Sequence, residues 1–168
     1  YLMGANRRAG VGAPDYVKYM LSRPVKVQPG SEFVYSTADS ILAGRMVEKA
    51  VGKRLSEYLY ERFFEPLGQG FPIWENCPQG HPIGGGGMFM TLSNMLKIGQ
   101  VYLMDGKWKG QQLVDPAWIK EATAKQIETP NPGNDIWVCG YGYQFWRNPY
   151  EDSYRADGAY GQLTMVLP

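Results

Sequence analysis

The stretch that decides our interpretation of the fold is Pro29-Gly30-Ser31-Glu32-Phe33-Val34-Tyr35-Ser36-Thr37. Pro29-Gly30 predicts a tight turn, because proline fixes φ and glycine accepts the positive φ that turns often need. Phe33-Val34 then predicts a short apolar strand. Ser36 and Asp39 have the Ser-x-x-acid spacing of a capping box, so we expect a long helix to begin here. Tyr35 stands at the corner before this helix, either as a phenol that exchanges protons or as an ordinary packing side chain.

Helical segments dominate the chain on both sides of this corner. Helical spacing and capping residues predict helices at about 15–22, 37–51, 55–64, 91–104 and 115–125, with loops at 1–13, 69–87 and 126–137. The same spacing places Met46, Phe63 and Leu103 on the inner faces of their helices. After residue 137 the apolar period changes to two, which predicts strands at 140–146, 154–156 and 163–167. Helices followed by an antiparallel sheet indicate an α+β fold. We expect one incomplete domain over residues 1–168, with a mostly helical lobe at 14–137 and sheet strands at 138–168.

Length and composition exclude several classes of protein. With 168 residues, 44% hydrophobic and 20% charged, the chain suits one soluble globular domain. The net charge of +1 and the lack of a basic block argue against nucleic-acid binding, and no apolar run could span a membrane. Cys77 and Cys139 are far apart in the sequence, so they are either two buried thiols or one disulfide bridge.

Most of the usual hydrolytic signatures are missing. The one histidine, His81, has no Gly-x-Ser-x-Gly motif to pair with, and a single histidine with scattered acids does not make a metal site. The glycine run 84–87 permits close backbone approach, whereas a phosphate loop would need a preceding strand and a following Lys-Ser/Thr. The carboxylate pairs Glu61/Glu65 and Glu151/Asp152 have the pattern of solvated residues.

Several ordered motifs between residues 14 and 168 carry a resemblance to a known family. These are Pro-Gly-x-x-Phe-x-Tyr-Ser, Phe-x-Glu-Pro-Leu-Gly, Gly-Gly-Gly-Met-Phe-Met-Thr, Lys-Trp-x-Gly-Gln-Gln-Leu-Val, Tyr-Gly-Tyr-Gln-Phe-Trp and Asp-Gly-Ala-Tyr-Gly-Gln. In this order they resemble the serine hydrolases related to class C β-lactamases, which include penicillin-binding DD-peptidases, esterases and aminohexanoate-oligomer hydrolases. The resemblance implies a partial β-lactamase/DD-peptidase-like fold, with the helical lobe followed by the first sheet strands.

The resemblance also implies a set of site residues. Tyr35 matches the family's tyrosine base, and the backbone N–H of Gln162 matches half of the oxyanion hole. Thr37 stands where many members have asparagine, and Ala159, Tyr160 and Gly161 stand where the family has Lys-Thr-Gly or His-x-Gly. Thr37 and the Ala159–Gly161 segment would bind substrate, while Gly161 alone keeps the family's residue type.

The nucleophile that this chemistry requires is not found in the sequence. The family uses a serine with a lysine one helical turn later, and no Ser-x-x-Lys occurs among the 168 residues. Ser93 and Lys97 are one residue too far apart for that geometry. The resemblance implies that the Ser-Lys helix precedes residue 1 and that further strands follow Pro168, so we expect this chain to be an internal fragment.

The sequence therefore predicts an enzyme that hydrolyses an amide or ester through an acyl-enzyme, inactive as this fragment. Its expected partners are a small-molecule or peptide-like substrate and the remainder of the same domain, with no metal and no organic cofactor. The resemblance favours export to the periplasm or cell surface. One alternative is a catalytically inactive relative that binds peptidoglycan or peptides, or acts as a sensor. Another is a carbohydrate- or peptide-binding domain that uses the rings of Tyr141, Tyr143, Trp146 and Tyr160.

Overall fold

A computed structural model describes residues 13–130 and 135–168 of the protein. The chain divides into two compact units, Tyr1–Met90 and Thr91–Pro168, and each unit is described by itself. The loop predicted over residues 1–13 lies outside the described residues apart from Ala13, as does the middle of the loop predicted over 126–137.

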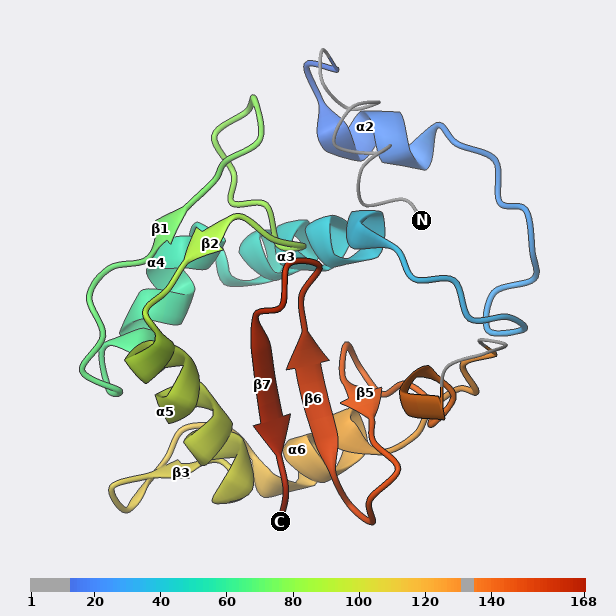
Figure 1. Ribbon diagram of the computed structural model, residues 1–168. Helices are drawn as coiled ribbons and strands as arrows, with labels where there is room; N and C mark the ends of the chain where they lie inside the picture. The colour runs from blue at the N-terminus through green and yellow to red at the C-terminus, as the bar shows by residue number, and fades with distance from the viewer. Residues whose placement is uncertain (1–12, 131–134) are drawn as a thin grey trace. The chain divides into compact units, whose positions relative to one another are not determined.

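The first unit consists of helices and one small sheet (Figure 1). Its elements are α2 (Tyr16–Leu21), α3 (Thr37–Val51), α4 (Leu55–Leu59), the π-helical turn η1 (Tyr60–Phe64), and the antiparallel strands β1 (Ile73–Trp74) and β2 (Met88–Phe89). The side chain of Asp15 accepts a hydrogen bond from Lys18 N at 2.9 Å and so caps α2. Gly52, with φ +68°, ends α3 in the left-handed conformation that glycine adopts most easily. These helix boundaries agree with the sequence prediction.

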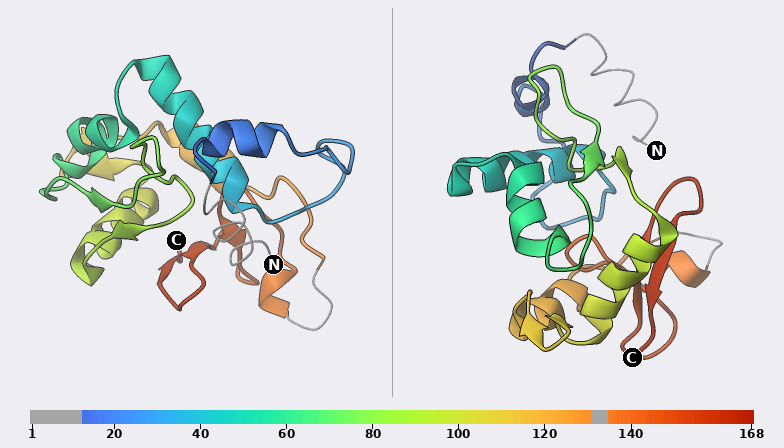
Figure 2. Two further views of the ribbon diagram at one scale, coloured as in Figure 1. Left: turned by 90° about the horizontal axis from the view of Figure 1, so that it is seen from above. Right: turned by 90° about the vertical axis from the view of Figure 1, so that its left-hand side faces the viewer.

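The second half of the helix predicted over residues 55–64 buries a different residue from the one expected. α4 continues directly into η1, and α3 and α4 lie at an angle to one another (Figure 2). In η1 the backbone N–H of Glu65 bonds the Tyr60 carbonyl, five residues back, at 2.9 Å. The wider turn shifts the helix face by part of a residue. As a result Phe64, 4% exposed, enters the core in place of the predicted Phe63.

The inner face of α3 also differs from the prediction. Met46 was expected inside but is 71% exposed, whereas Glu48 is 7% exposed. The Glu48 carboxylate accepts a hydrogen bond from Leu55 N at 2.9 Å, which satisfies a free N–H at the start of α4. The same carboxylate pairs with Arg45. These partners allow a charged side chain to take an inner position that the pattern of apolar residues assigned elsewhere.

The second unit combines two helices with a three-stranded sheet (Figure 1). Its elements are α5 (Leu92–Leu103), the hairpin of β3 (Lys107–Trp108) and β4 (Gln111–Gln112), α6 (Pro116–Thr123), the 3-10 turn η2 (Asp135–Trp137), and β5 (Trp146–Arg147), β6 (Tyr154–Asp157) and β7 (Leu163–Val166). The sheet is antiparallel with strand order β5-β6-β7. α5 packs beside β7, and Gly99 permits the close approach because a Cβ there would lie 2.9 Å from the Thr164 methyl group.

Two predictions for this unit are corrected by the structure. Residues 140–145 do not form a strand, because Gly140 and Gln144 take positive φ values of +97° and +69° that interrupt an extended run. On α5, the fully buried residue is Val101 instead of Leu103, which is 47% exposed. The helices and the final strands otherwise follow the predicted order.

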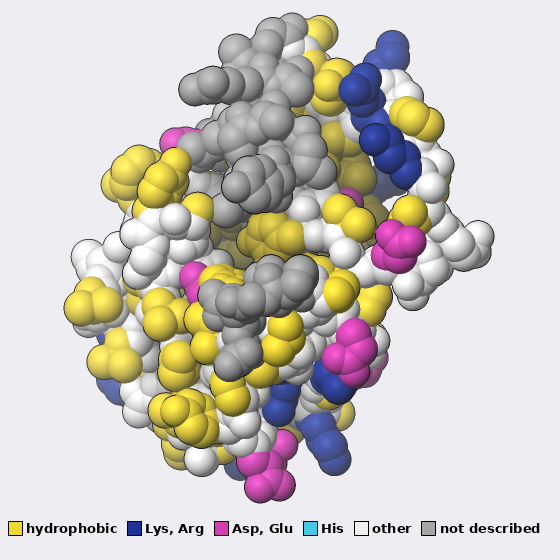
Figure 3. Space-filling view, turned by 45° about the vertical axis from the view of Figure 1, so that its right-hand side comes forward, with side chains coloured by type: hydrophobic (Ala, Val, Ile, Leu, Met, Phe, Trp, Pro, Cys, Tyr) yellow, Lys and Arg dark blue, Asp and Glu magenta, His cyan; other side chains and the backbone are white. Residues whose placement is uncertain are grey.

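Each unit has its own set of buried side chains. In the first unit these are Ile41, Leu55, Phe64, Leu67 and Cys77, and in the second Val101, Ile119, Ala122, Tyr154 and Val166. Cys77 is buried in the first unit and Cys139 half-buried in the second, and the structure joins them by no disulfide. Other large hydrophobic side chains reach the surface, as the yellow side chains in Figure 3 show. Among the described residues, no helix has the length and hydropathy required to cross a bilayer.

Candidate active site

Tyr35 lies directly before the N-terminus of α3, as the sequence predicts. Its side chain is half-buried, and the extended backbone of Ser36 (φ −139°, ψ 116°) leads into the helix at Thr37. Two local predictions fail here. Among the described residues, Phe33-Val34 is not part of a strand, and the Ser36 side chain makes no capping hydrogen bond.

The glycine run holds the first turns of α3 by close backbone contact. A Cβ on Gly84 would lie 2.5 Å from the Ser40 carbonyl oxygen, and one on Gly85 would lie 2.8 Å from the Thr37 carbonyl oxygen. Real side chains do not tolerate such distances, so only glycine fits at these two positions. The indole N–H of Trp74 fixes the same turn, since it donates to the carbonyls of Ile83 and Gly86 at 2.9 and 2.8 Å.

This contact shows that Gly84 and Gly85 serve to pack against α3. Thr37 is in direct contact with Gly85. The Thr37 hydroxyl oxygen is buried and has no hydrogen-bond partner among the described residues. Its methyl group contacts the position where a Gly85 side chain would begin. The substrate-binding role expected for Thr37 stays a prediction.

Gly85→Ala should displace the start of α3 and destabilise the first unit. We expect a loss of about 2 kcal/mol in the free energy of unfolding, because the added methyl group meets Thr37 in a packed site. Urea unfolding followed by circular dichroism measures this loss. Gly86→Ala is the matched control, since a Cβ at Gly86 meets nothing within 4 Å. Equal stability of the two variants would contradict the packing role.

The residues expected to bind substrate in the second unit form the loop of the β6–β7 hairpin. The N–H of Gly158 bonds the Gln162 carbonyl at 3.0 Å, and the N–H of Gly161 bonds the Gly158 carbonyl at 3.1 Å. Gly161 needs to be glycine for its φ of +86°. Ala159 is exposed, and Tyr160 at the tip is 93% exposed.

Gln162 closes this loop with both its backbone and its side chain. A Cβ on Gly158 would lie 2.5 Å from the carboxamide carbon and nitrogen of Gln162, so the side chain folds back over the Gly158 backbone. Gly158 therefore makes room for the Gln162 side chain. The loop is a compact turn in which the N–H groups of Gly158 and Gly161 are bonded within the turn itself. The oxyanion role expected for the Gln162 N–H stays a prediction.

Arg155 anchors the strand that leads into this loop, a role that the sequence analysis missed. Its side chain is 2% exposed, and the guanidinium donates to Asp157 Oδ2 at 3.1 Å and to Asn148 Oδ1 at 2.7 Å. It also donates to the carbonyls of Arg147 and Ile136 at 3.0 and 3.1 Å. The rings of Trp137 and Trp146 lie 4.6 and 5.9 Å from its central carbon. The only sequence signal for this anchor is an arginine within an apolar strand.

Other tyrosines of the chain are less suited to act as a base. Burial raises the pKa of Tyr154 to about 12 and raises the pKa of Tyr102. The hydrogen bond from the Tyr143 hydroxyl to Glu121, 3.0 Å long, raises the pKa of Tyr143. A phenol whose pKa is raised ionises less readily than a free phenol, so these three tyrosines are poor candidates for a base.

His81 belongs to a structural cluster at the surface of α3. Its Nδ1 lies 2.6 Å from Arg45 Nη1 and 3.0 Å from Glu48 Oε2. Burial and the nearby guanidinium groups of Arg45 and Arg54 lower the pKa of His81. Within residues 13–130 and 135–168, no group of three or more acids, histidines and cysteines is placed to hold a metal ion.

The aromatic residues considered for a binding groove are divided among three places. Tyr141 and Trp146 pack edge to face with centroids 4.8 Å apart, and Tyr143 lies 5.6 Å from the Trp118 ring. Tyr160 is in the hairpin loop, away from these pairs in the sheet register. Tyr143 and Tyr160 are exposed, and the binding groove considered for these rings stays a prediction.

The candidate residues thus form two groups, the Tyr35–Thr37 corner in the first unit and the Ala159–Gln162 loop in the second. The family model described as Beta-lactamase matches residues 3–168, which is nearly the whole chain. The chain belongs to the beta-lactamase family. Its fold is the partial α+β fold of this family, as the sequence resemblance predicted.

Known proteins similar to this beta-lactamase-family chain include peptidase-like and esterase relatives. The Escherichia coli (strain K12) protein named "Putative D-alanyl-D-alanine carboxypeptidase" is 42% identical over 45 residues, 27% of this chain and 10% of that protein. Lovastatin esterase of Penicillium rubens is 38% identical over 55 residues, 33% of this chain and 14% of that protein.

A solved structure confirms the fold over a longer stretch. The "putative beta-lactamase" from Bacteroides dorei DSM 17855 has a TM-score of 0.77 at 22% identity. The match covers 90% of this chain and 51% of that one, so this beta-lactamase-family chain spans about half the length of that protein.

Proposed function

We propose that this protein is a serine hydrolase that cleaves an amide or ester through an acyl-enzyme, with Tyr35 as the general base. The observation that carries the proposal is the position of Tyr35 at the N-terminal corner of α3, held by the glycine run, in a member of the beta-lactamase family. The glycine run contacts the Thr37 and Ser40 carbonyls just after Tyr35, and a firmly held helix start favours one position of the phenol for proton transfer.

The proposed reaction has two steps with balanced proton transfers. The Tyr35 phenolate takes the proton of a serine hydroxyl as the serine oxygen attacks the substrate carbonyl, and the resulting phenol gives this proton to the leaving amine or alcohol. In the second step, Tyr35 takes a proton from a water molecule as the water oxygen attacks the acyl carbonyl. Tyr35 then gives this proton to the departing serine oxygen. The backbone N–H of Gln162 stabilises the negative oxygen in both steps.

The nucleophile of this reaction is not among the 168 residues, which contain no Ser-x-x-Lys. We propose that it lies in a further part of the protein, and the greater length of the Bacteroides dorei protein supports this proposal. A nearby lysine would also lower the pKa of the Tyr35 phenol from about 10, which a general base at neutral pH requires.

The substrate class is an amide or ester with a small-molecule or peptide-like body. Relatives named as a carboxypeptidase and an esterase support both bond types. Thr37, Ala159, Tyr160 and Gly161 are the proposed substrate-binding residues. Ala159 carries no charge, so recognition of a substrate carboxylate through this position is not part of the proposal.

The second candidate function is that of a catalytically inactive relative that binds peptides or peptidoglycan. The buried Thr37 hydroxyl and the uncharged Ala159 favour it, because two positions that resemble substrate-binding ones present no polar side chain to a ligand. The two functions differ in whether a reactive serine exists.

Covalent labelling of the full-length protein with a fluorescent fluorophosphonate separates these two functions. A hydrolase should incorporate one label per chain on a serine, identified by peptide mass spectrometry, and heat-denatured protein should incorporate none. A native protein that takes up no label, together with retained binding of peptidoglycan fragments, would reject the enzyme and support the inactive relative.

A further inference from the structure

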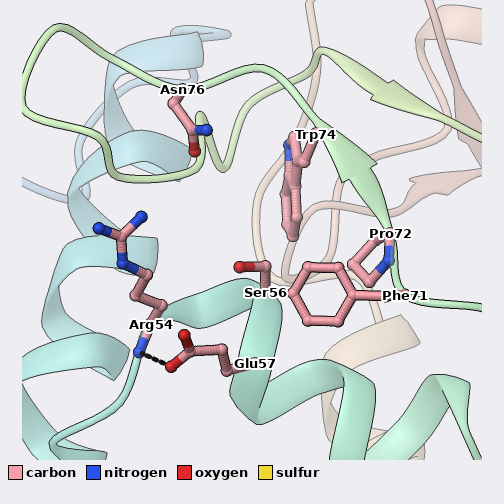
Figure 4. A pocket seen from close by; sticks show the side chains of 7 residues that line it. All are labelled: Arg54, Ser56, Glu57, Phe71, Pro72, Trp74 and Asn76. Carbon is pink, nitrogen blue, oxygen red and sulfur yellow. Dashed lines mark hydrogen bonds between the residues drawn. The ribbon is translucent and has the colours of Figure 1, made fainter.

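A small pocket in the first unit lies between the start of α4 and the segment that carries β1. Its volume is about 260 Å³, and none of its lining residues belongs to the candidate active site. Figure 4 shows Phe71, Pro72 and Trp74 on one side and Arg54 and Asn76 on the other. This size admits a ligand of about ten non-hydrogen atoms, smaller than the ligands of most drug-sized sites.

Ser56 supplies a hydroxyl group to the pocket lining. The residue as a whole is 8% exposed. In Figure 4 this hydroxyl points toward the space between Arg54 and the rings. A hydroxyl in a pocket wall can donate a hydrogen bond to a bound anion.

The Arg54 guanidinium gives the pocket a positive charge. One of its nitrogens donates to the Gly80 carbonyl at 2.8 Å, which fixes the side chain, and no ion pair within the described residues neutralises it. The carboxylate of Glu57, also in the lining, instead faces the backbone N–H of Arg54 at 3.3 Å. The guanidinium is therefore free to bind an anion with its remaining N–H groups.

The opposite wall offers flat apolar surface. The Trp74 N–H is already bonded to two carbonyls, so its ring contributes only carbon surface to the pocket. Phe71 is 56% exposed, and its ring is supported by Tyr60 at a centroid distance of 5.3 Å. Such a wall suits an aromatic or cycloalkyl group.

We propose that this pocket binds a small monocarboxylate that carries a flat apolar ring. The carboxylate pairs with Arg54 and accepts hydrogen bonds from Ser56 and Asn76, while the ring packs between Trp74 and Phe71. The hydrogen-bond donors on the polar side of the pocket suit an anion. The apolar side has room for one aromatic ring.

Titration with phenylacetate, followed by saturation-transfer difference NMR, tests this site. We expect saturable binding with a Kd of about 1 mM, the range for a ligand of this size. 2-Phenylethanol, which keeps the ring but lacks the charge, should bind at least tenfold more weakly. Methyl glucoside should not bind, and tighter binding of it or of 2-phenylethanol would overturn the proposal.

Variants of the pocket residues test whether phenylacetate binds in this pocket. A control variant and a folding check exclude misfolding as the cause of weaker binding. Arg54→Gln should weaken phenylacetate binding about tenfold, and Ser56→Ala should weaken it severalfold. Arg62→Gln is the matched control, because Arg62 is an exposed arginine of the same unit outside the pocket. Circular dichroism checks that each variant is folded. Equal affinities of Arg54→Gln and Arg62→Gln, or no saturation with the wild type at 20-fold above the expected Kd, would overturn the proposal.

Discussion

Tyr35→Phe in the full-length protein should reduce kcat/KM for ester hydrolysis by about 10²–10⁴, the usual contribution of general acid–base catalysis. The substitution removes only the phenolic oxygen and keeps the ring that packs before α3. KM should change little, because the lost proton transfer acts in the transition state. Hydrolysis of p-nitrophenyl butyrate measures the effect.

The control for this prediction is another tyrosine outside the proposed site. Tyr150 is 68% exposed in the turn between β5 and β6, and Tyr150→Phe should retain the wild-type rate. Thermal unfolding should show that both variants are as stable as the wild type. A Tyr35→Phe enzyme within about threefold of the wild-type rate, well below the 10²-fold minimum, would exclude Tyr35 as the base.

Arg155→Met should lower the free energy of unfolding by about 3–5 kcal/mol, the largest effect on stability that we expect. The guanidinium holds β6 to the Ile136 and Arg147 carbonyls, and its loss leaves these acceptors and Asp157 unpaired in a buried site. Arg155→Lys should not restore stability, because an ammonium cannot reproduce the planar set of donors. Urea unfolding measures both variants.

A double variant separates the ion pair from the rest of this network. Asp157→Asn combined with Arg155→Met should recover part of the loss, since it removes the unpaired carboxylate. Arg62→Met is the control for the loss of an exposed arginine and should cost less than about 0.5 kcal/mol. If Arg155→Met were as stable as this control, Arg155 would not be an anchor of the hairpin.

In the second unit, local sequence patterns predict where helices begin but not which extended segment pairs as a strand. The Asp115-Pro116 start of α6 and the Thr91 cap of α5 follow from side chains that bond nearby N–H groups, so they are visible in the sequence. The segment at 140–145 alternates like a strand but is not one, because positive φ values at Gly140 and Gln144 depend on packing against other segments.

In the candidate site, too, local features were predicted from the sequence and contacts between distant segments were not. Tyr35, the start of α3 and the loop from Gly158 to Gln162 were all predicted, because turn residues, helix signals and family motifs are local features of the chain. The anchor Arg155 and the pocket at Arg54 were not predicted. Both depend on carbonyls and rings from segments that are distant in the sequence.

The sequence by itself determined the order of the helices and of the final two strands, the family, and the corner at Tyr35, since caps, turns and motifs act over a few residues. Only the tertiary structure decided which residues are buried. Glu48 replaced Met46 inside α3 because the N–H of Leu55 and the Arg45 guanidinium satisfy its carboxylate. The tertiary structure also explains why residues 84 and 85 are glycines. A side chain at either position would collide with the backbone of α3.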